Sequence, residues 1–373
     1  MKNHTVKYIN SPAPSAFAGK GSLQRGLSLV ELMISITIGL LILAALSTLF
    51  VNQSKTRAEL DKSNRMIDNG RYALEVLSDN LRLAGYYGEF SPNATTPGAP
   101  GALPDPCTTT AADISAALLL AVQGYEAAAQ ASQITGLPPL CGFTYTAGDR
   151  RSLKPGSDLL AIRRASTATP IVVGAAMANT HYLQVSRCQY DAVPYKLSTT
   201  PADFTLRKSS NCTPASGAPY ADLRNFLVQV YFVAPSNNAT VVVPGSGCAV
   251  GDCIPTLKRY EIDQSNPSTN QFVVTPLVEG VEYMQVDYGL DAGTDGVPDS
   301  FIKAPVLAQW PNIVAVRINV LARNNEPTSG YKDTKTYSLG EAGTFGPFND
   351  SYKRHVYTQF VRLTNPAGRR DPL

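Results

Sequence analysis

The stretch that most constrains this chain is residues 32–51, twenty consecutive residues without a charged side chain. Fifteen of the twenty are Ala, Val, Ile, Leu, Met or Phe. At the rise of an α-helix, about 1.5 Å per residue, such a stretch covers the roughly 30 Å hydrocarbon core of a bilayer. The sequence therefore predicts a membrane-spanning helix, and it places one carboxylate, Glu31, directly before that helix.

The flanks of this stretch predict its orientation. The first 26 residues contain Lys2, Lys7, Lys20 and Arg25 and no acidic side chain. An excess of Lys and Arg keeps its side of a span cytoplasmic. A secretory signal would carry a small-residue cleavage site after the apolar stretch, but a polar segment follows instead. The favourable point for processing lies before the apolar stretch, at Gly26.

The helical pattern continues beyond the apolar stretch. Residues 52–84 contain no Pro and a single Gly, and both signs of charge are mixed on the remaining faces. Apolar residues recur at steps of seven, three and four, which indicates one stripe on a helix. The members of this predicted stripe are Leu60, Ile67, Leu74, Leu77, Leu81 and Ala84. Gly85 follows as a natural C-terminal stop.

After residue 88 the sequence changes character. Residues 91–106, rich in Pro, Gly, Ala and Thr, predict a loop, and the Ala/Leu run 111–122 predicts a short helix. Short β-rich runs bounded by turn residues predict strands at 158–164, 180–186, 226–233, 256–263, 272–278, 281–290, 313–322 and 354–364. The predicted class is α+β. A long N-terminal helix, membrane-spanning in its first half and amphipathic in its second, packs on an antiparallel, β-sheet-rich head.

The string RGLSLVELMISITIGLLILAAL, residues 25–46, resembles the class III signal of type IV prepilins and type II secretion pseudopilins. The resemblance implies cleavage between Gly26 and Leu27 and N-methylation of Leu27. It also implies that Glu31, as mature residue five, pairs with the N-terminus of a neighbouring subunit. A carboxylate in hydrocarbon is costly without a cationic partner, and a negative charge suits the first helical turn. The alternative is an ordinary single-span anchor with an interfacial Glu.

Two positions depart from the common prepilin pattern. Leu27 stands where the family most often has Phe, and Thr48 stands where many major pilins carry a helix-kinking Pro. Without Pro the span should be straighter and fully hydrogen-bonded. This fits a minor component of the filament at least as well as its bulk subunit.

The segment DNGRYALEVLSDNLRLAGYYG, residues 68–88, resembles the end of the helix in PilW-type minor pilins. Four later segments resemble the same family: SDLLAIRR, LVEGVEYMQVDYGLD, WPNIVAVRINVLAR and RHVYTQFVRLTNP. The J-class minor pseudopilins of type II secretion have a looser version of the helix pattern. A generic amphipathic helix with a Gly cap would explain the apolar stripe but not the whole string. The resemblance implies a pilin-like fold.

All six cysteines follow the span, on the side where disulfides persist if the basic leader is cytoplasmic. Six cysteines allow fifteen pairings. We expect sequential neighbours to pair and each bond to contribute about 2–4 kcal/mol. The expected pairs are Cys107–Cys141, Cys188–Cys212 and Cys248–Cys253. A zinc site is the weaker alternative, because the sequence has no C-x-x-C and the spacings of the cysteines are irregular.

One segment is similar to half of a calcium loop. Asp291, Asp295 and Asp299 place oxygen ligands at positions one, five and nine. However, position three is Gly293, and position twelve, directly before Lys303, is not the Glu ligand of such a loop. Asp and Gly are also the usual residues of a plain turn, which we favour here. Apart from this calcium candidate, no cofactor is expected.

Catalytic and nucleic-acid-binding signatures were not found. The sequence contains no G-x-S-x-G and no H-E-x-x-H, and its Gly-Lys-Gly-Ser at residues 19–22 lacks the rest of a phosphate loop. The net charge of +3 and the lack of a long basic run give no reason to expect a nucleic-acid partner. We therefore expect a structural protein rather than an enzyme.

The resemblance implies a domain plan and a set of partners. The leader is residues 1–26, the transmembrane helix 27–51, its amphipathic continuation 52–85 and the head 86–373. The implied protein is a minor pilin with a cytoplasmic N-terminus and a periplasmic head, held in the inner membrane before it enters the pilus fibre or tip. Its implied partners are the prepilin peptidase, the inner-membrane assembly platform and other minor and major pilins. The alternatives are a J-class pseudopilin and a tip adhesin or DNA-uptake component.

Overall fold

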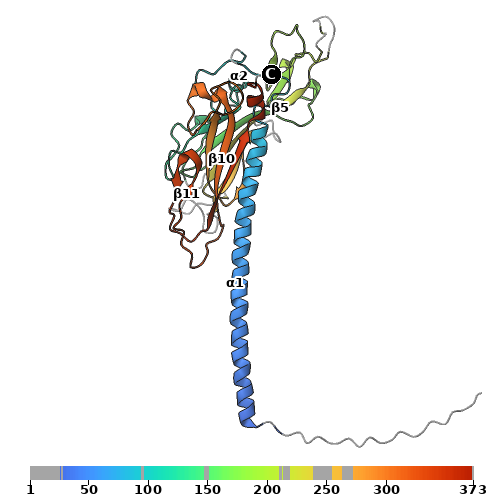
Figure 1. Ribbon diagram of the computed structural model, residues 1–373. Helices are drawn as coiled ribbons and strands as arrows, with labels where there is room; N and C mark the ends of the chain where they lie inside the picture. Colours follow the sequence, from blue (N-terminus) through green and yellow to red (C-terminus); the bar gives the residue numbers. More distant parts are fainter. Residues whose placement is uncertain are drawn as a thin grey trace, which may run out of the picture. The chain divides into compact units, whose positions relative to one another are not determined.

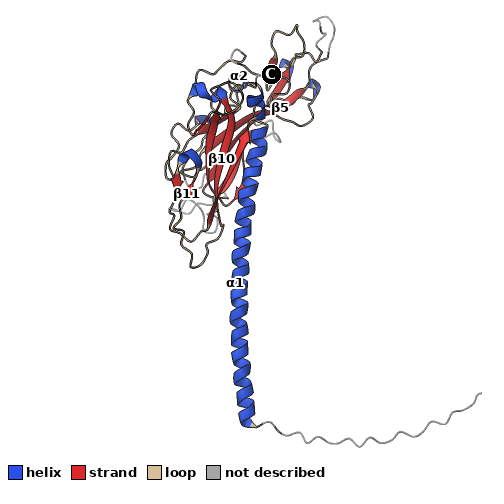
Figure 2. Ribbon diagram, in the orientation of Figure 1, coloured by secondary structure: helices blue, strands red, loops and turns tan. Residues whose placement is uncertain are grey.

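The computed structural model describes residue 26 and residues 28–93, 96–146, 151–209, 212, 219–237, 254–262 and 272–371. The chain divides into two compact units, Met1–Ala58 and Glu59–Leu373. Figure 1 colours the elements in chain order, and Figure 2 distinguishes the long helix α1 from the strands of the head. Leu27, Cys248 and Cys253 lie outside the described residues, so the expectations for them stay predictions.

The N-terminal pattern forms one helix, α1 (Leu29–Arg82), of 54 residues. The segment has no Pro to interrupt the backbone hydrogen bonds, and its Gly residues are too few to break it. Gly85 lies just beyond the helix with a φ of 71°, a conformation that residues with a Cβ rarely adopt. Its N–H donates to the carbonyl of Arg163 at 2.8 Å. The predicted stop at Gly85 therefore also joins the helix end to the head.

The head contains two larger antiparallel sheets. The first has the order β1-β2-β5-β3-β4, with β6 beside β5 and β7 beside β6. Its strands are β1 (Val122–Tyr125), β2 (Leu159–Ala165), β3 (Tyr182–Val185), β4 (Tyr195–Ser198), β5 (Leu223–Ala234), β6 (Thr256–Ile262) and β7 (Phe272–Glu279). The second has the order β13-β10-β8-β9, with β8 (Val281–Leu290), β9 (Ser300–Ile302), β10 (Ile313–Arg323) and β13 (Arg354–Arg362).

Short elements complete the described head. They are α2 (Ala111–Ala116), α3 (Thr364–Gly368) and a two-stranded ribbon, β11 (Tyr337–Ser338) with β12 (Thr344–Phe345). The long helix and the antiparallel sheets confirm the predicted α+β class.

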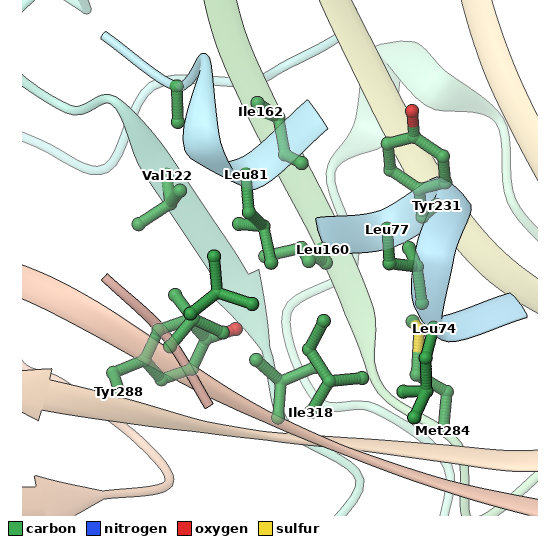
Figure 3. Close-up of a cluster of buried hydrophobic side chains, with 14 of the residues drawn as sticks. Leu74, Leu77, Leu81, Val122, Leu160, Ile162, Tyr231, Met284, Tyr288 and Ile318 are labelled. Atoms are coloured by element: carbon green, nitrogen blue, oxygen red, sulfur yellow. The ribbon is translucent and has the colours of Figure 1, made fainter. Parts of the chain in front are cut away.

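The main core joins the second half of α1 to both large sheets. Leu74, Leu77 and Leu81 are buried and point toward side chains of both sheets (Figure 3). The facing residues include Leu160, Ile162, Tyr231, Met284, Tyr288 and Ile318. Burying side chains of this size contributes about 1.5–3 kcal/mol each. The part of the predicted apolar stripe from Leu74 to Leu81 therefore packs against both large sheets of the head.

Three sequence expectations were wrong in detail. Leu60 is 57% exposed and does not belong to the buried stripe, which begins at Met66. The run expected to be helical to residue 122 leaves the helix at Ala116, and Val122 begins β1. The last predicted strand ends at Arg362, because Thr364 already begins α3. Short apolar runs do not distinguish helix from strand by periodicity alone.

Candidate functional site

The start of α1 contains the residues that the prepilin resemblance singled out. The first helical hydrogen bond runs from Leu32 N to Ser28 O, so Glu31 lies in the first turn. The N–H of Ser28 donates to Glu31 Oε2 at 3.4 Å, a long capping contact. An added Cβ at Gly26 would meet no atom within 4 Å. Glu31 thus occupies the helix end at which a negative charge is favoured, close to the bond predicted to be cut.

The next turns form an apolar surface. Within the described residues, α1 is the one helix long and apolar enough to cross a membrane, and its most apolar stretch is wholly exposed. This finding agrees with the predicted span. An exposed apolar surface of this size is typical of a site of contact with a membrane or with other apolar surfaces.

The hydroxyl groups in this apolar segment bond back to their own helix. Ser35 donates to Glu31 O at 2.7 Å, Thr37 to Ile34 O at 2.8 Å and Ser47 to Leu43 O at 2.8 Å. Thr48, the residue at the common Pro position, donates to Ala45 O at 2.8 Å. Each hydroxyl therefore finds an acceptor without an external partner.

A close approach fixes where the second half of α1 meets the second sheet. A Cβ added to Gly70 would lie 2.2 Å from Cε2 of Tyr357 on β13, much closer than atoms can come. Gly70 therefore lets the Tyr357 ring lie against the helix backbone. The Gly belongs to the N-G-R string and the Tyr to the R-H-V-Y string, and sequence patterns did not show that the two meet.

A polar contact fixes the N-terminal end of the part of α1 that packs on the head. Glu59 accepts hydrogen bonds from Thr328 Oγ1 at 2.7 Å, Lys353 Nζ at 3.1 Å and Lys62 Nζ at 3.2 Å. The bond from Thr328, together with those from the two lysines, lowers the pKa of Glu59 to about 2, against the effect of desolvation. Here the head presents a polar loop to the helix, which explains why nearby Leu60 is not buried.

Two disulfides confirm two of the three expected pairs. Cys107 bonds to Cys141 and Cys188 bonds to Cys212. Asp105 lies beside the first pair, and the three side chains could otherwise form a metal site. Disulfide sulfurs lack the thiolate that metal binding requires, so this cluster is not a zinc site. Among the described cysteines the disulfide prediction holds.

The calcium candidate forms an internally bonded turn. Asp291 accepts from the N–H groups of Thr294 and Gly296 and pairs with Arg370 Nε at 2.7 Å. The Arg370 guanidinium thus already supplies the cation for this carboxylate. The other two acids are also engaged: Asp299 accepts from the N–H groups of residues 292 and 293, and Asp295 from that of residue 297. These contacts fit the plain turn that we favoured.

A buried arginine that the sequence did not single out joins a long loop to the second sheet. Arg354, 6% exposed, donates to Glu282 at 2.5 Å, Asp350 at 2.6 Å and Asp333 at 2.9 Å. Burial alone would lower the pKa of Arg354, yet its bonds to Asp350 and Glu282 raise it above the usual value. Three carboxylates therefore hold one fixed cation, and the cluster is structural.

Two acids, the buried Asp158 and the half-buried Glu126, lie near the point where the two large sheets meet. Asp158 accepts from the N–H of Ala127 at 2.8 Å and from that of Val286, on β8, at 2.9 Å. Lys303 Nζ lies 3.6 Å from Glu126 Oε1. Burial raises the pKa of Glu126 to about 7, against the lowering effect of Lys303. Burial, and then the charge of Glu126, raise the pKa of Asp158 well above its usual value.

A surface cleft of about 320 Å³ has charged walls. Four of its charged residues are joined in pairs, Arg187 with Glu89 at 2.8 Å and Lys208 with Asp222 at 2.6 Å, and the fifth, Arg224, donates to the carbonyl of Ser166 at 3.1 Å. A nucleophile next to a general base is not among the side chains that line it. The residues with the clearest functional pattern are therefore those at the start of α1.

Comparison with known proteins agrees with this pattern. Residues 230–365 match the family model of type IV pilus-assembly protein W, and residues 21–47 match the prokaryotic N-terminal methylation motif. No curated protein matches the chain. Among solved structures, a type IV-like pilin from Thermus thermophilus is 16% identical, and the match covers 38% of this chain and 78% of the pilin with a TM-score of 0.18. The similarity to type IV pilus proteins therefore rests on the two family models and not on this structural match.

Proposed function

On the premise that this chain is a PilW-type prepilin, with the family's pattern in its C-terminal half and the methylation motif at its N-terminus, we propose that it is a minor pilin of type IV pilus assembly. Its role is structural rather than catalytic. Before assembly it is held in the inner membrane, with its N-terminus cytoplasmic and its head periplasmic. After the prepilin peptidase removes residues 1–26 and Leu27 is methylated, it joins other minor and major pilins at the assembly platform and helps to prime the fibre.

The observation that carries this proposal is the composition of α1 along its length. Its first part exposes an uncharged apolar surface with a carboxylate, Glu31, in the first turn. Its second part, from Met66 to Leu81, is buried in the head's core. One helix therefore offers an apolar surface and a single anionic group for contacts with other subunits, while the head is fixed to its other half.

The first test is the N-terminus of the mature protein, read by mass spectrometry. We expect methylated Leu27 in the native host and an uncleaved precursor for a Gly26→Lys variant. A mature protein that begins at any other residue would refute the assignment as a prepilin.

The second test separates the charge of Glu31 from its capping contact. A Glu31→Gln variant keeps an oxygen that can accept from Ser28 N but loses the negative charge. We expect normal cleavage and loss of the protein from sheared fibres, with less fibre overall. Glu75→Gln, which removes the charge of an exposed carboxylate elsewhere on α1, serves as the matched control and should assemble normally.

Two further measurements, protein export in the Glu31→Gln strain and binding by fibres that lack the head, separate the related functions. Normal pilation with lost protein export would favour a J-class pseudopilin. Fibres of normal number that fail to bind surfaces or DNA when the head is absent would favour a tip adhesin or an uptake component.

A further inference from the structure

A cleft of about 230 Å³ lies where three segments of the head that are distant in sequence meet. The segment before β1 supplies Leu119, the turn before β10 supplies Trp310, and the end of the described chain supplies Arg369 and Arg370. We call this hollow the Trp310 cleft. It is smaller than the pockets of about 300–1,000 Å³ that hold drug-sized molecules, so its size suits a small ligand.

One side of the Trp310 cleft is apolar. Its side chains belong to the main core or pack against it, and they are Leu119, Val122, Trp310 and Ile313. The Trp310 ring is 4% exposed, and its centre lies 4.8 Å from that of the Tyr288 ring. Because the same side chains fill the core, this wall is preformed. An apolar group that left water to lie against it would gain free energy.

The other side of the cleft carries a positive charge without an acidic partner. Arg369 donates through Nη2 to the carbonyl of Gly85, and its guanidinium lies 5.6 Å from the centre of the Tyr87 ring. Within the described chain Arg369 forms no ion pair, and the residues that line the cleft include no acid. Burial lowers the pKa of Arg369, and the opposing effect comes from Tyr87 instead of a carboxylate. A half-buried guanidinium of this kind gains from an anion that accepts its remaining N–H groups.

The neighbouring Arg370 has the acidic partner that Arg369 lacks. Arg370 Nε lies 2.7 Å from Asp291 Oδ2, and its Nη1 donates to Asn312 Oδ1 at 2.7 Å. Its Nη2 also donates to the carbonyl of Asp291 at 3.1 Å. The charge of Arg370 is therefore balanced within the fold, and the charge of Arg369 is left to attract an anion.

We propose that the Trp310 cleft binds a small organic carboxylate with an apolar body. The carboxylate accepts N–H groups of Arg369, and the apolar body packs against Trp310 and Leu119. A carboxylate suits this guanidinium because both groups are planar and can form two parallel hydrogen bonds. A bare inorganic anion is disfavoured, because it would lose water at the apolar wall without gaining hydrogen bonds there. The site lies wholly in the head and does not depend on entry of the chain into a pilus.

The first experiment uses Trp310 as its own reporter, because this residue is the only tryptophan and forms part of the wall. Phenylacetate is titrated into the full chain in a non-ionic detergent, and the fluorescence is recorded. Phenylacetamide, which lacks the charge, and acetate, which lacks the ring, are the matched probes. We expect saturable binding of phenylacetate, with affinity about tenfold or more weaker for each of the other two. Equal affinity for phenylacetate and phenylacetamide, or no saturable binding of phenylacetate, would overturn the proposal.

Two variants test the charge of the cleft without changing its size greatly. Asn312→Asp adds a carboxylate and should weaken phenylacetate binding about tenfold by like-charge repulsion, while phenylacetamide binding stays the same. Arg369→Gln keeps an N–H donor for the Gly85 carbonyl and should abolish the preference for the acid over the amide. Lys208→Gln, which removes a half-exposed cation elsewhere in the head, is the control. A preserved preference in Arg369→Gln would overturn the proposal, and Asn312→Asp decides alone where that variant fails to fold.

A third probe distinguishes a free ligand from the end of a protein chain. Acetyl-Gly-Gly-Phe carries an aromatic group and a carboxylate on a peptide. Because the cleft is small, we expect this peptide to bind at least about tenfold more weakly than phenylacetate. Tighter binding of the peptide would assign the cleft to a protein terminus and would overturn the proposed free ligand.

Discussion

The contact between Gly70 and Tyr357 gives a prediction in which one substitution changes stability in opposite directions. In an open helix interior, Gly→Ala stabilises by about 1 kcal/mol. At position 70 the new methyl group would overlap the Tyr357 ring, at 2.2 Å from Cε2, and overpacking of this kind costs about 1–3 kcal/mol. We therefore expect Gly70→Ala to destabilise the head by about 1 kcal/mol despite its higher helix propensity.

Removing the ring should reverse this sign. In a Tyr357→Ala background the methyl group meets no aromatic atoms, so the propensity term remains and Gly70→Ala should stabilise by about 1 kcal/mol. The coupling between the two substitutions is then about 2 kcal/mol, well above the ~0.5 kcal/mol within which independent sites add. A Gln359→Ala background, two residues along the same strand, serves as the control and should leave Gly70→Ala destabilising.

The assay is urea unfolding of the full chain in detergent, followed by tryptophan fluorescence. Trp310 is the only tryptophan and is 4% exposed, with its ring 4.8 Å from that of Tyr288 in the main core. Its signal therefore reports the head and not the apolar part of α1. A stabilising Gly70→Ala in the native background, or additive energies across the cycle, would refute the close approach.

Three further predictions concern the head. In the folded protein the pKa of the Glu126 carboxyl is raised to about 7, so it contributes stability that is present below its ordinary pKa, near 4.5, and is lost as pH rises through 7. Glu126→Gln should therefore reduce the fall in Tm between pH 5 and 8 by about 2–4 °C. An unchanged fall in Tm would exclude Glu126 as the titrating group. Replacing both Cys107 and Cys141 by Ser should lower the free energy of unfolding by about 2–4 kcal/mol, and reductant should then have less effect than on the native chain. Arg354→Met should cost about 3–5 kcal/mol, because three carboxylates lose their cation; a cost below 1 kcal/mol in the same urea assay would contradict the cluster's role.

The sequence predicted the features that depend on local pattern. An uncharged run followed by an apolar stripe predicted one helix, and Leu74, Leu77 and Leu81 are indeed its buried face. The strand at Ile313–Arg323 was visible because apolar residues alternate along it. The pairing of cysteines as sequential neighbours holds for the two described disulfides, since each closes a local loop.

The features that the sequence did not predict depend on contacts between distant segments. Leu60 continues the helical stripe by spacing, yet it is exposed because the head meets that turn through Glu59 and a polar loop instead of its core. The role of Gly70 is visible only when Tyr357 is placed beside it. The acids around Arg354 come from three separate segments, and no spacing rule brings them together.

The hydroxyl groups of the apolar segment have a consequence for how the helix could change surroundings. Ser35, Thr37, Ser47 and Thr48 all donate to carbonyls of their own helix. A helix that used these groups to bond its neighbours would have to break such bonds whenever it left them. Here, transfer from a lipid environment to one made of other apolar helices exchanges one set of dispersion contacts for another and breaks no hydrogen bond. The hydrogen bonds of this segment therefore have nearly the same energy in both surroundings. The difference in free energy between the two surroundings then depends mainly on Glu31, the one charged group at the start of the segment.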